Sequence, residues 1–397
     1  MRRALALAVT GALGALLTIT MVDVPASAAP TSPATHRVCS AASAGFAACD
    51  SWVHAKPAAT TPTGYGPADL QSAYNLAAAS ASNGAGVTIG IVDAFDDPTA
   101  FADVNTYRAQ FGIPALASCT PTTIRSATTA CFTKSSQTGT TTLPRKNGSW
   151  AQEESLDVDM ASAICARCNI LLVEADTNSL TNLGTGVNEA VALGSAVVSN
   201  SYGGGEASGE VAEENQFYNH PGVAITASSG DGGFGVEFPA ASQFVTAVGG
   251  TSLVRAANAR GWSETVWSGA GSGCSAFITK PAWQHDTGCA RRTVADVSAD
   301  ADPNTGVAVF DSTAFQGLSG WLEFGGTSVA SPIIASVYAL AGNASTVTYG
   351  SFPYSHTASL NDVTSGSNGT CGSYLCTGTA GYDGPTGLGT PNGTGAF

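Results

Sequence analysis

Strand-length apolar runs alternate with segments of helical spacing through the middle of this chain. The apolar runs, rich in β-branched residues, cover residues 86–93, 169–175, 196–201, 223–227 and 243–248. The segments of helical spacing cover residues 67–76, 97–111, 152–165, 180–193 and 210–218. Because strands that alternate with helices form a mostly parallel sheet covered on both faces, the pattern predicts an α/β fold. We expect one domain over residues 63–397.

Three predicted strands end at polar residues suited to chemistry. Asp93 ends the first run, and the loops over residues 199–205 and 228–233 follow two later runs. In open parallel sheets, reacting groups lie beyond the carboxyl ends of the strands. We therefore expect a functional site at this edge of the sheet.

The first 29 residues have the pattern of a secretory signal. A basic start is followed by an apolar run from Ala4 to Met21 and by small residues that end in Ala-x-Ala, so we expect cleavage near Ala28 or Ala29. An uncleaved membrane anchor is the alternative, although glycine and threonine interrupt the run. No later segment has the ~18 unbroken apolar residues that a membrane span requires. We expect a secreted, extracellular protein.

Residues 30–62 are rich in Ala, Thr, Pro and Ser, and we interpret them as a short extended leader or arm. The ten cysteines fall as sequence neighbours, in the pairs 39/49, 119/131, 165/168, 274/289 and 371/376. In an exported protein this pattern indicates five local disulfides, although spacing alone does not fix connectivity. Cys165 and Cys168 could instead form a redox or zinc motif, but no second pair or histidine cluster accompanies them.

The charge balance excludes two classes of partner. The formal net charge is −14, and only 11% of the residues are charged. An acidic chain of this kind is not suited to nucleic acid or to an anionic membrane surface. With 44% hydrophobic residues, the chain can bury a large core.

A glycine turn and a serine precede one strongly apolar segment. Residues 325–332 read Gly-Gly-Thr-Ser-Val-Ala-Ser-Pro, and an apolar helical run follows. A serine at a helix N-terminus has free backbone N–H groups beside it, which suits a nucleophile with an oxyanion site at its own amide. An ordinary glycine turn with a capping serine is the alternative for Ser328.

A serine nucleophile needs a base, and the histidines do not supply one. None of the five lies in the His-Gly-Thr helix start of a subtilisin. Glu153 and Asp157 lie four residues apart on a predicted helix, so they share a face and can share a proton. An acidic first turn that favours the helix dipole is the alternative. Asp231 lies in a glycine turn after an apolar strand; if buried there, its carboxyl group would be protonated and could donate to an oxyanion.

The chain resembles the sedolisins, serine-carboxyl peptidases that keep a subtilisin-like fold and use glutamate in place of histidine. Their Glu-x-x-x-Asp helix matches Glu153 and Asp157, their Ser-Gly-Asp turn matches Asp231, and their Gly-Thr-Ser-x-Ala-Ser segment matches Ser328. Further stretches that are similar to the family cover residues 238–240, 248–251, 280–284 and 296–303.

The resemblance implies a role for each residue. Glu153 would be the general base on Ser328 and later the acid to the leaving amine, and Asp157 would hydrogen-bond and orient Glu153. Asp231 would be the protonated oxyanion donor. Because an ionised glutamate and a protonated aspartate must coexist, we expect an endopeptidase with an acidic pH optimum.

The resemblance also implies a C-terminal calcium loop. Its ligands would be the carboxylates of Asp362 and Asp383 with carbonyl oxygens of Val363, Thr379 and Gly381, a set that suits one Ca²⁺ ion. Thr379 replaces the usual first glycine of that loop, and a plain turn is the alternative.

We expect polypeptide substrates, no nucleic-acid partner, no membrane contact after signal removal, and a monomer. A catalytically silent, calcium-stabilised binding protein of the same fold and a histidine-dependent subtilisin are the other hypotheses. Sedolisins usually carry a large prosegment, whereas here only residues 30–62 lie between the signal and the predicted domain. We expect the domain to fold without a separate prosegment, with the disulfides contributing.

Overall fold

The computed structural model of the chain describes residues 35–54 and 60–397, which belong to one compact unit. The predicted signal segment, residues 1–29, lies outside the described residues. Among the residues that are described, no helix is both long and apolar enough to cross a membrane.

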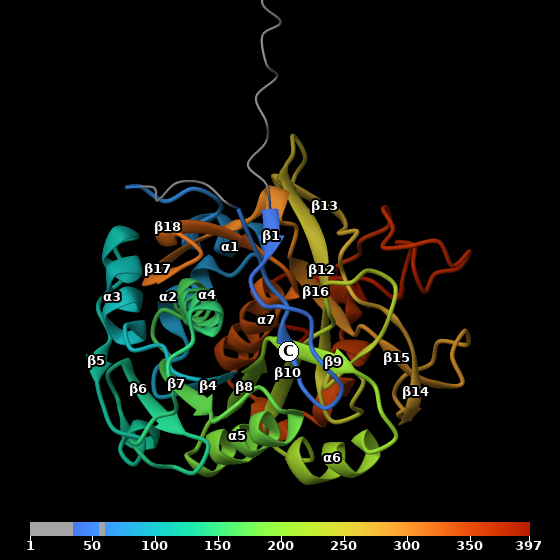
Figure 1. Cartoon of the computed structure of the whole chain (residues 1–397). Coiled ribbons are helices and arrows are strands. Elements are labelled where there is room, and N and C mark those ends of the chain that lie inside the picture. The colour runs from blue at the N-terminus through green and yellow to red at the C-terminus, as the bar shows by residue number, and fades with distance from the viewer. Residues whose placement is uncertain (1–34, 55–59) are drawn as a thin grey trace, which may run out of the picture. The chain divides into compact units, whose positions relative to one another are not determined.

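A nine-stranded sheet forms the centre of the fold (Figure 1). Its order is β13 (Trp262–Val266), β12 (Thr246–Arg255), β10 (Ala224–Ser228), β8 (Val197–Asn200), β4 (Thr88–Ala94), β7 (Asn169–Ala175), β6 (Cys131–Ser136) and β5 (Ala117–Ser118), with β16 (Val297–Asp300) paired to β12. All the pairs are parallel except β12 with β13. Strands β4 and β7 are buried along their whole length, as expected for parallel strands rich in Val, Ile and Leu. The predicted mostly parallel α/β fold is confirmed.

Helices cover both faces of this sheet. Helices α4 (Gly148–Ile164) and α7 (Thr327–Ala341) lie together on one face, and α5 (Leu180–Ala192) packs against β4 and β7 from the other (Figure 1). The remaining helices are α1 (Pro67–Ala73), α2 (Ala77–Ser82), α3 (Ala100–Gln110), α6 (Glu210–Phe217) and α8 (Phe352–Ser355). The helix predicted over 67–76 ends at Ala73, and a second helix, which was not predicted, begins at Ala77. Asn75 lies between them with φ 56°, a left-handed conformation that ends the first.

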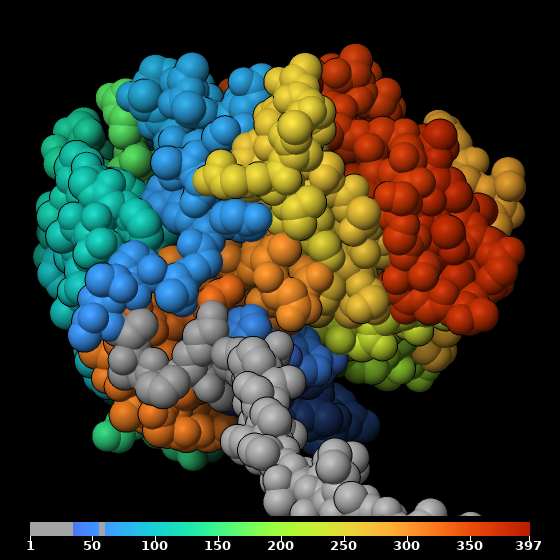
Figure 2. All heavy atoms as spheres, turned by 90° about the horizontal axis from the view of Figure 1, so that it is seen from above, coloured from blue at the N-terminus to red at the C-terminus, as the bar shows by residue number. Residues whose placement is uncertain are grey.

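The described part of the predicted arm, residues 35–54, is built into the fold. Strand β3 (Trp52–His54) pairs with β18 (Leu318–Gly325), and β1 (Thr35–Arg37) pairs antiparallel with β3. Strand β18 also forms a hairpin with β17 (Val307–Phe315), which completes a four-stranded sheet. Seen from above, dark-blue atoms of the N-terminal segment lie beside the orange atoms of the β17–β18 region (Figure 2). Residues 35–54 are thus joined to the domain by strand pairing.

A small three-stranded sheet brings the same segment to the carboxyl edge of the main sheet. It has the order β11 (Glu237–Phe238), β9 (Tyr202–Gly205) and β2 (Ala48–Cys49). Strand β9 directly follows β8, so β2 lies against residues that leave the carboxyl end of a central strand.

The five predicted disulfides are confirmed. They join Cys39–Cys49, Cys119–Cys131, Cys165–Cys168, Cys274–Cys289 and Cys371–Cys376. Cys165 and Cys168 are thus a disulfide in this structure and not a metal site. Each bridge closes a loop of at most 15 residues, a size for which the chain-entropy account gives about 3 kcal/mol or less. Two small antiparallel sheets complete the fold, one of β14 (Gly273–Thr279) with β15 (Arg291–Val294) and one of β19 (Leu360–Asn361) with β20 (Thr390–Pro391).

Candidate active site

Ser328 is the second residue of α7, and its side chain is buried. The helix begins after Gly326, whose φ of 104° is a conformation that glycine adopts without strain. A Cβ atom at this position would also collide with the carbonyl oxygen of Asp50 and with Asp231. The glycine turn therefore lets two oxygen-bearing groups approach the helix N-terminus closely.

Two hydrogen bonds fix the position of Ser328. Its Oγ donates to the carbonyl oxygen of Ser201 at 3.0 Å, and its backbone N–H donates to the carbonyl oxygen of Asp50 at 2.9 Å. The second bond is the one that an oxyanion site at the nucleophile's amide would make with a substrate carbonyl group.

Glu153 and Asp157 come from α4, one turn apart and fully buried. Asn147 caps the helix, because its side chain accepts hydrogen bonds from the N–H groups of Ser149 and Trp150. Burial and then the neighbouring Asp93 raise the pKa of Glu153 well above its usual value, whereas the hydroxyl groups of Ser328 and Ser51 lower it. The structure thus brings Glu153 and Ser328 together at one place.

Asp157 is held near Glu153 in the same buried setting. Burial, Asp93 and Glu153 raise the pKa of Asp157, in that order, and the hydroxyl group of Ser201 lowers it. The predicted hydrogen bond between Asp157 and Glu153 stays a prediction. Asp93, the last residue but one of β4, is a third acid that sequence reasoning placed at a strand end but not in the site. Burial raises the pKa of Asp93 to about 8.

The other two acids of α4 face away from Ser328. Glu154 lies near Glu174 and Lys134, and these two residues form an ion pair at 2.8 Å. Asp159 accepts a hydrogen bond from the N–H of Phe310 at 2.9 Å, so it connects α4 to β17.

Asp231 lies beside the N-terminus of α7 and is 3% exposed. Its Oδ1 accepts hydrogen bonds from the N–H and the hydroxyl group of Thr327. Its Oδ2 has no hydrogen-bond partner among the described residues. Burial raises the pKa of Asp231 to about 7, against the opposing effect of the Thr327 hydrogen bonds. Protonation of Oδ2 would make it a hydrogen-bond donor, and this predicted role of Asp231 stays a prediction.

The hydrogen bonds of the histidines lead away from this site. His54 contacts the carbonyl oxygen of Pro303, His220 contacts Asn188, and His356 contacts Phe352. Glu153 contacts Ser328, Asp231 contacts the preceding Thr327, and Asp157 lies near Ser201.

Two curated proteins are similar to this chain in sequence, and one solved structure is similar to it in fold. Sedolisin from Pseudomonas sp. (strain 101) is 29% identical over 375 residues, which cover 84% of this chain and 60% of that protein. Kumamolisin from Bacillus sp. (strain MN-32) is 30% identical over 323 residues, which cover 72% of this chain and 53% of that protein. A solved structure of Pseudomonas sedolisin, a serine-carboxyl proteinase in complex with two molecules of pseudo-iodotyrostatin, matches with a TM-score of 0.68. The match has 26% identity over 84% of this chain and 96% of the other.

This chain belongs to the sedolisin family. It spans between about half and three fifths of the length of the two curated relatives. No family model matches the chain. The sedolisin-like fold places the carboxylates of α4, the aspartate turn after β10 and the serine of α7 at one edge of the sheet.

The residues predicted as the calcium loop of this sedolisin-family chain also lie together. The N–H of Gly381 donates to Asp362 at 2.9 Å, and the N–H of Thr379 donates to Asp383 at 3.0 Å. Asp383 is fully buried, and Asp362 lies close enough to raise its pKa. Two neighbouring carboxylates, one of them buried, are oxygen donors of the kind that Ca²⁺ prefers. The carbonyl ligands of Val363, Thr379 and Gly381 stay a prediction.

A second group of acids lies elsewhere, between α3 and β17. Oxygen atoms of Asp97, Asp103 and Asp311 lie within 4.8 Å of one another, and all three residues are buried. Hydroxyl groups of Thr99 and Thr313 donate to Asp97, at 3.0 and 3.2 Å. The three carboxyl groups are close enough to hold a metal ion, and they are separate from the predicted calcium loop.

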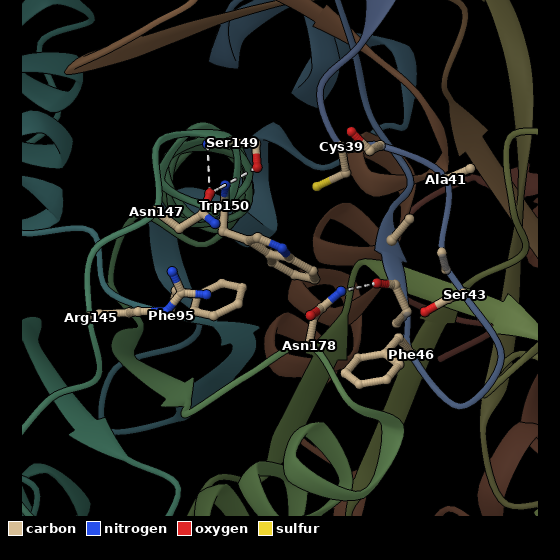
Figure 3. A pocket seen from close by; sticks show the side chains of 14 residues that line it. Cys39, Ala41, Ser43, Phe46, Phe95, Arg145, Asn147, Ser149, Trp150 and Asn178 are labelled. Carbon is tan, nitrogen blue, oxygen red and sulfur yellow. Dashed lines mark hydrogen bonds between the residues drawn. The ribbon is translucent and has the colours of Figure 1, made fainter.

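A cavity of about 390 Å³ lies beside the N-terminal segment, near the start of α4 (Figure 3). Trp150 lines it and packs edge-on against Phe95, with ring centroids 6.4 Å apart. Arg145 lies over the same Phe95 ring at 4.8 Å. Trp150 therefore serves both as a cavity wall and as part of an aromatic cluster that includes Tyr202.

Proposed function

We propose that this protein is a secreted, acid-acting serine-carboxyl endopeptidase. The observation that carries the proposal is the backbone N–H of Ser328, which donates to a peptide carbonyl oxygen beside the unpartnered Oδ2 of Asp231. A substrate carbonyl at this position would have two oxyanion donors and a nucleophile within reach. The names of the relatives support a peptidase reaction.

The proposed reaction uses only carboxyl groups and the serine. Glu153 takes the proton from Ser328 as Oγ attacks the carbonyl carbon. The negative oxygen of the tetrahedral intermediate is stabilised by the Ser328 N–H and by protonated Asp231, an interaction of the type worth about 3–4 kcal/mol. Glu153 then donates its proton to the leaving amine, and water hydrolyses the acyl-enzyme. Asp157 positions Glu153 and shares its proton.

The titration of Asp231 sets the upper limit of this activity. Because burial raises the pKa of Asp231 to about 7, the oxyanion donor is lost as the pH rises through neutrality. The lower limit depends on ionisation of Glu153, whose pKa burial raises. Ser51 contacts Glu153 in this structure, and opening of the site to water would reduce the burial of Glu153 and so lower its pKa.

The signal segment and the C-terminal loop would have roles outside the reaction itself. The signal over residues 1–29 would be removed on export, and the mature protein would act as a monomer on polypeptides. Calcium in the loop of Asp362 and Asp383 would join the C-terminal segments and would take no part in the reaction.

Replacement of Ser328 by Ala tests the proposal. The variant should lose cleavage of acid-denatured casein at pH 3–5 while it keeps its circular dichroism spectrum. Replacement of all five histidines should leave cleavage at the level of the parent chain. A pH optimum near 8, or full activity of Ser328→Ala, would refute the proposed mechanism.

A further inference from the structure

Residues 46–50 lie in the candidate active site as a short extended segment; we call them the site strand. Ala48 and Cys49 pair antiparallel with β9. The N–H of Asp50 then donates to the carbonyl oxygen of Ser201 at 3.2 Å. Backbone pairing of this kind is how an extended peptide adds to a strand edge, and it does not depend on the side chains of the peptide. The site strand therefore shows a course that a peptide can take through the site.

The N–H of Ser328 fixes the register along this course. It donates to the carbonyl oxygen of Asp50 at 2.9 Å, which is the position proposed above for the carbonyl group of a substrate. Asp50 thus stands where the first residue before a scissile bond would lie. Counted from there toward the N-terminus, Ala47 stands at the place of the fourth residue.

Asn178 holds both polar backbone groups at this fourth place. Its side-chain amide donates to the carbonyl oxygen of Ala47 at 2.7 Å, and its backbone carbonyl oxygen accepts from the Ala47 N–H at 2.8 Å. Figure 3 shows the Asn178 side chain directed at the N-terminal segment, with Phe46 alongside it. Because both bonds are made to backbone atoms, any residue except proline could form them at this place.

The contact continues for two more residues away from the reacting position. Phe46 forms an antiparallel bridge with Ser179, and the N–H of Leu180 donates to the carbonyl oxygen of Gly45 at 3.1 Å. Residues 178–180 are therefore a second backbone edge, apart from β9, whose contacts begin at the fourth residue.

Hydrogen bonds within the body of the fold hold this edge in place. The Ser179 hydroxyl group accepts from the N–H of Asn182 and so caps α5. The Thr177 hydroxyl group accepts from the Ser179 N–H at 3.3 Å and from the Asn182 side chain at 2.9 Å. These three bonds do not involve the N-terminal segment, so they position the backbone at Asn178 whatever lies in the site.

We propose that Asn178 is a specificity-determining residue that binds the fourth substrate residue before the scissile bond. The inference rests on the proposed function. The substrate class is an internal stretch of unfolded polypeptide with at least four residues before the bond, and the side chain of the fourth residue is not selected. A chain that begins at the third residue lacks these contacts, so the edge at residues 178–180 favours endopeptidase action over the release of tripeptides.

Cleavage of acetylated peptides by the full chain at pH 4 tests the proposal. The peptides share one bond and have two, three, four or five residues before it. In the three-residue peptide the acetyl carbonyl group takes the place of the Ala47 carbonyl group, and the two-residue peptide has no group there. Asn178→Ala should therefore match the parent chain on the two-residue peptide. From three residues onward its kcat/KM should be about three- to tenfold lower, the effect of one hydrogen bond, with most of the loss in KM.

Asn188→Ala is the matched control. The Asn188 side chain donates to the carbonyl oxygen of Gln216 at 3.2 Å, a bond of the same kind between α5 and α6. This variant should match the parent chain on all four peptides. Each result is a ratio between two peptides on one variant, so the contacts of the site strand itself cancel.

The outcomes separate this inference from the proposed function. If Asn178→Ala lowers kcat/KM equally for all four peptides, Asn178 supports the fold and does not bind the fourth residue. Equal kcat/KM of parent and Asn178→Ala on every peptide would also overturn the inference, while cleavage by the parent would still support the proposed function. If the parent cleaves neither casein nor any of the peptides, the proposed function fails, and this inference fails with it.

Discussion

Thr327 fixes Asp231 through two hydrogen bonds to the same oxygen, from its N–H at 2.7 Å and from its hydroxyl group at 2.9 Å. The arrangement orients the carboxyl group so that Oδ2 stays free and buried beside the turn at Gly326. Because Thr327 directly precedes Ser328, the residue that positions the acid also begins the helix that carries the nucleophile. The two oxyanion donors are thereby fixed relative to each other.

Asp231 should be replaceable by another neutral donor. Asp231→Ala should lower kcat by about 10²- to 10³-fold, the effect of removing one oxyanion donor. Asp231→Asn should lose less and should also lose the fall in activity near pH 7, because an amide does not titrate there. Peptide cleavage between pH 3 and 8 measures both effects. An Asn variant with the parent's upper pH limit would assign that limit to another group.

Glu153 and Glu154 form a matched pair of buried neighbours on α4. Glu153→Gln should lower kcat by about 10²- to 10⁴-fold, the usual contribution of a general base. Glu154→Gln should keep kcat within a few-fold, because Glu154 faces Lys134 and Glu174 and not Ser328. Single-turnover cleavage of one peptide by both variants makes the comparison. Equal losses of kcat in the two variants would contradict a specific proton-transfer role for Glu153.

Calcium should stabilise the chain through Asp362 and Asp383. Removal of the ion with a chelator should lower Tm, and Ca²⁺ at a hundred times its Kd should restore about 2.7 kcal/mol. Asp383→Asn should abolish the dependence of Tm on calcium. Asp311→Asn, in the other acid cluster, should keep that dependence. If the calcium dependence of Tm is lost in the Asp311 variant and kept in the Asp383 variant, the ion binds at the Asp311 cluster and not at the predicted loop.

Stability should fall as the pH rises from about 4 to 8. Burial raises the pKa values of Asp93 and Asp311 to about 8, so in this range the folded chain binds more protons than the unfolded chain. The stabilisation is complete below the unfolded pKa of about 4 and is lost as the pH passes the folded values.

Urea unfolding of the Ser328→Ala chain at pH 4, 6 and 8 measures this slope without self-digestion. Asp93→Asn should reduce it, and the exposed control Asp176→Asn should leave it unchanged. A midpoint that rises with pH would mean that these carboxyl groups are ionised in the fold.

Much of the fold could be predicted because it depends on short-range patterns. The run over residues 169–175 coincides with β7, and the apolar segment after Ser328 is α7. The antiparallel β17–β18 hairpin was not predicted. Its strands are partly exposed and are interrupted by an irregularity between Asp311 and Phe315, so they lack the continuous apolar pattern of the central strands.

The sequence by itself determined the alternation of central strands and helices, the grouping of the cysteines as sequence neighbours, the shared helix face of Glu153 and Asp157, and the place of Ser328 at a helix start. Each of these depends on residues close together in the chain, where periodicity, loop length and capping act directly. Only the tertiary structure decided that the arm before residue 55 enters the cleft and that Asp93 joins the carboxylates. Strand pairing between distant segments, and the removal of water from acids packed together, are properties of the assembled fold that no local pattern encodes.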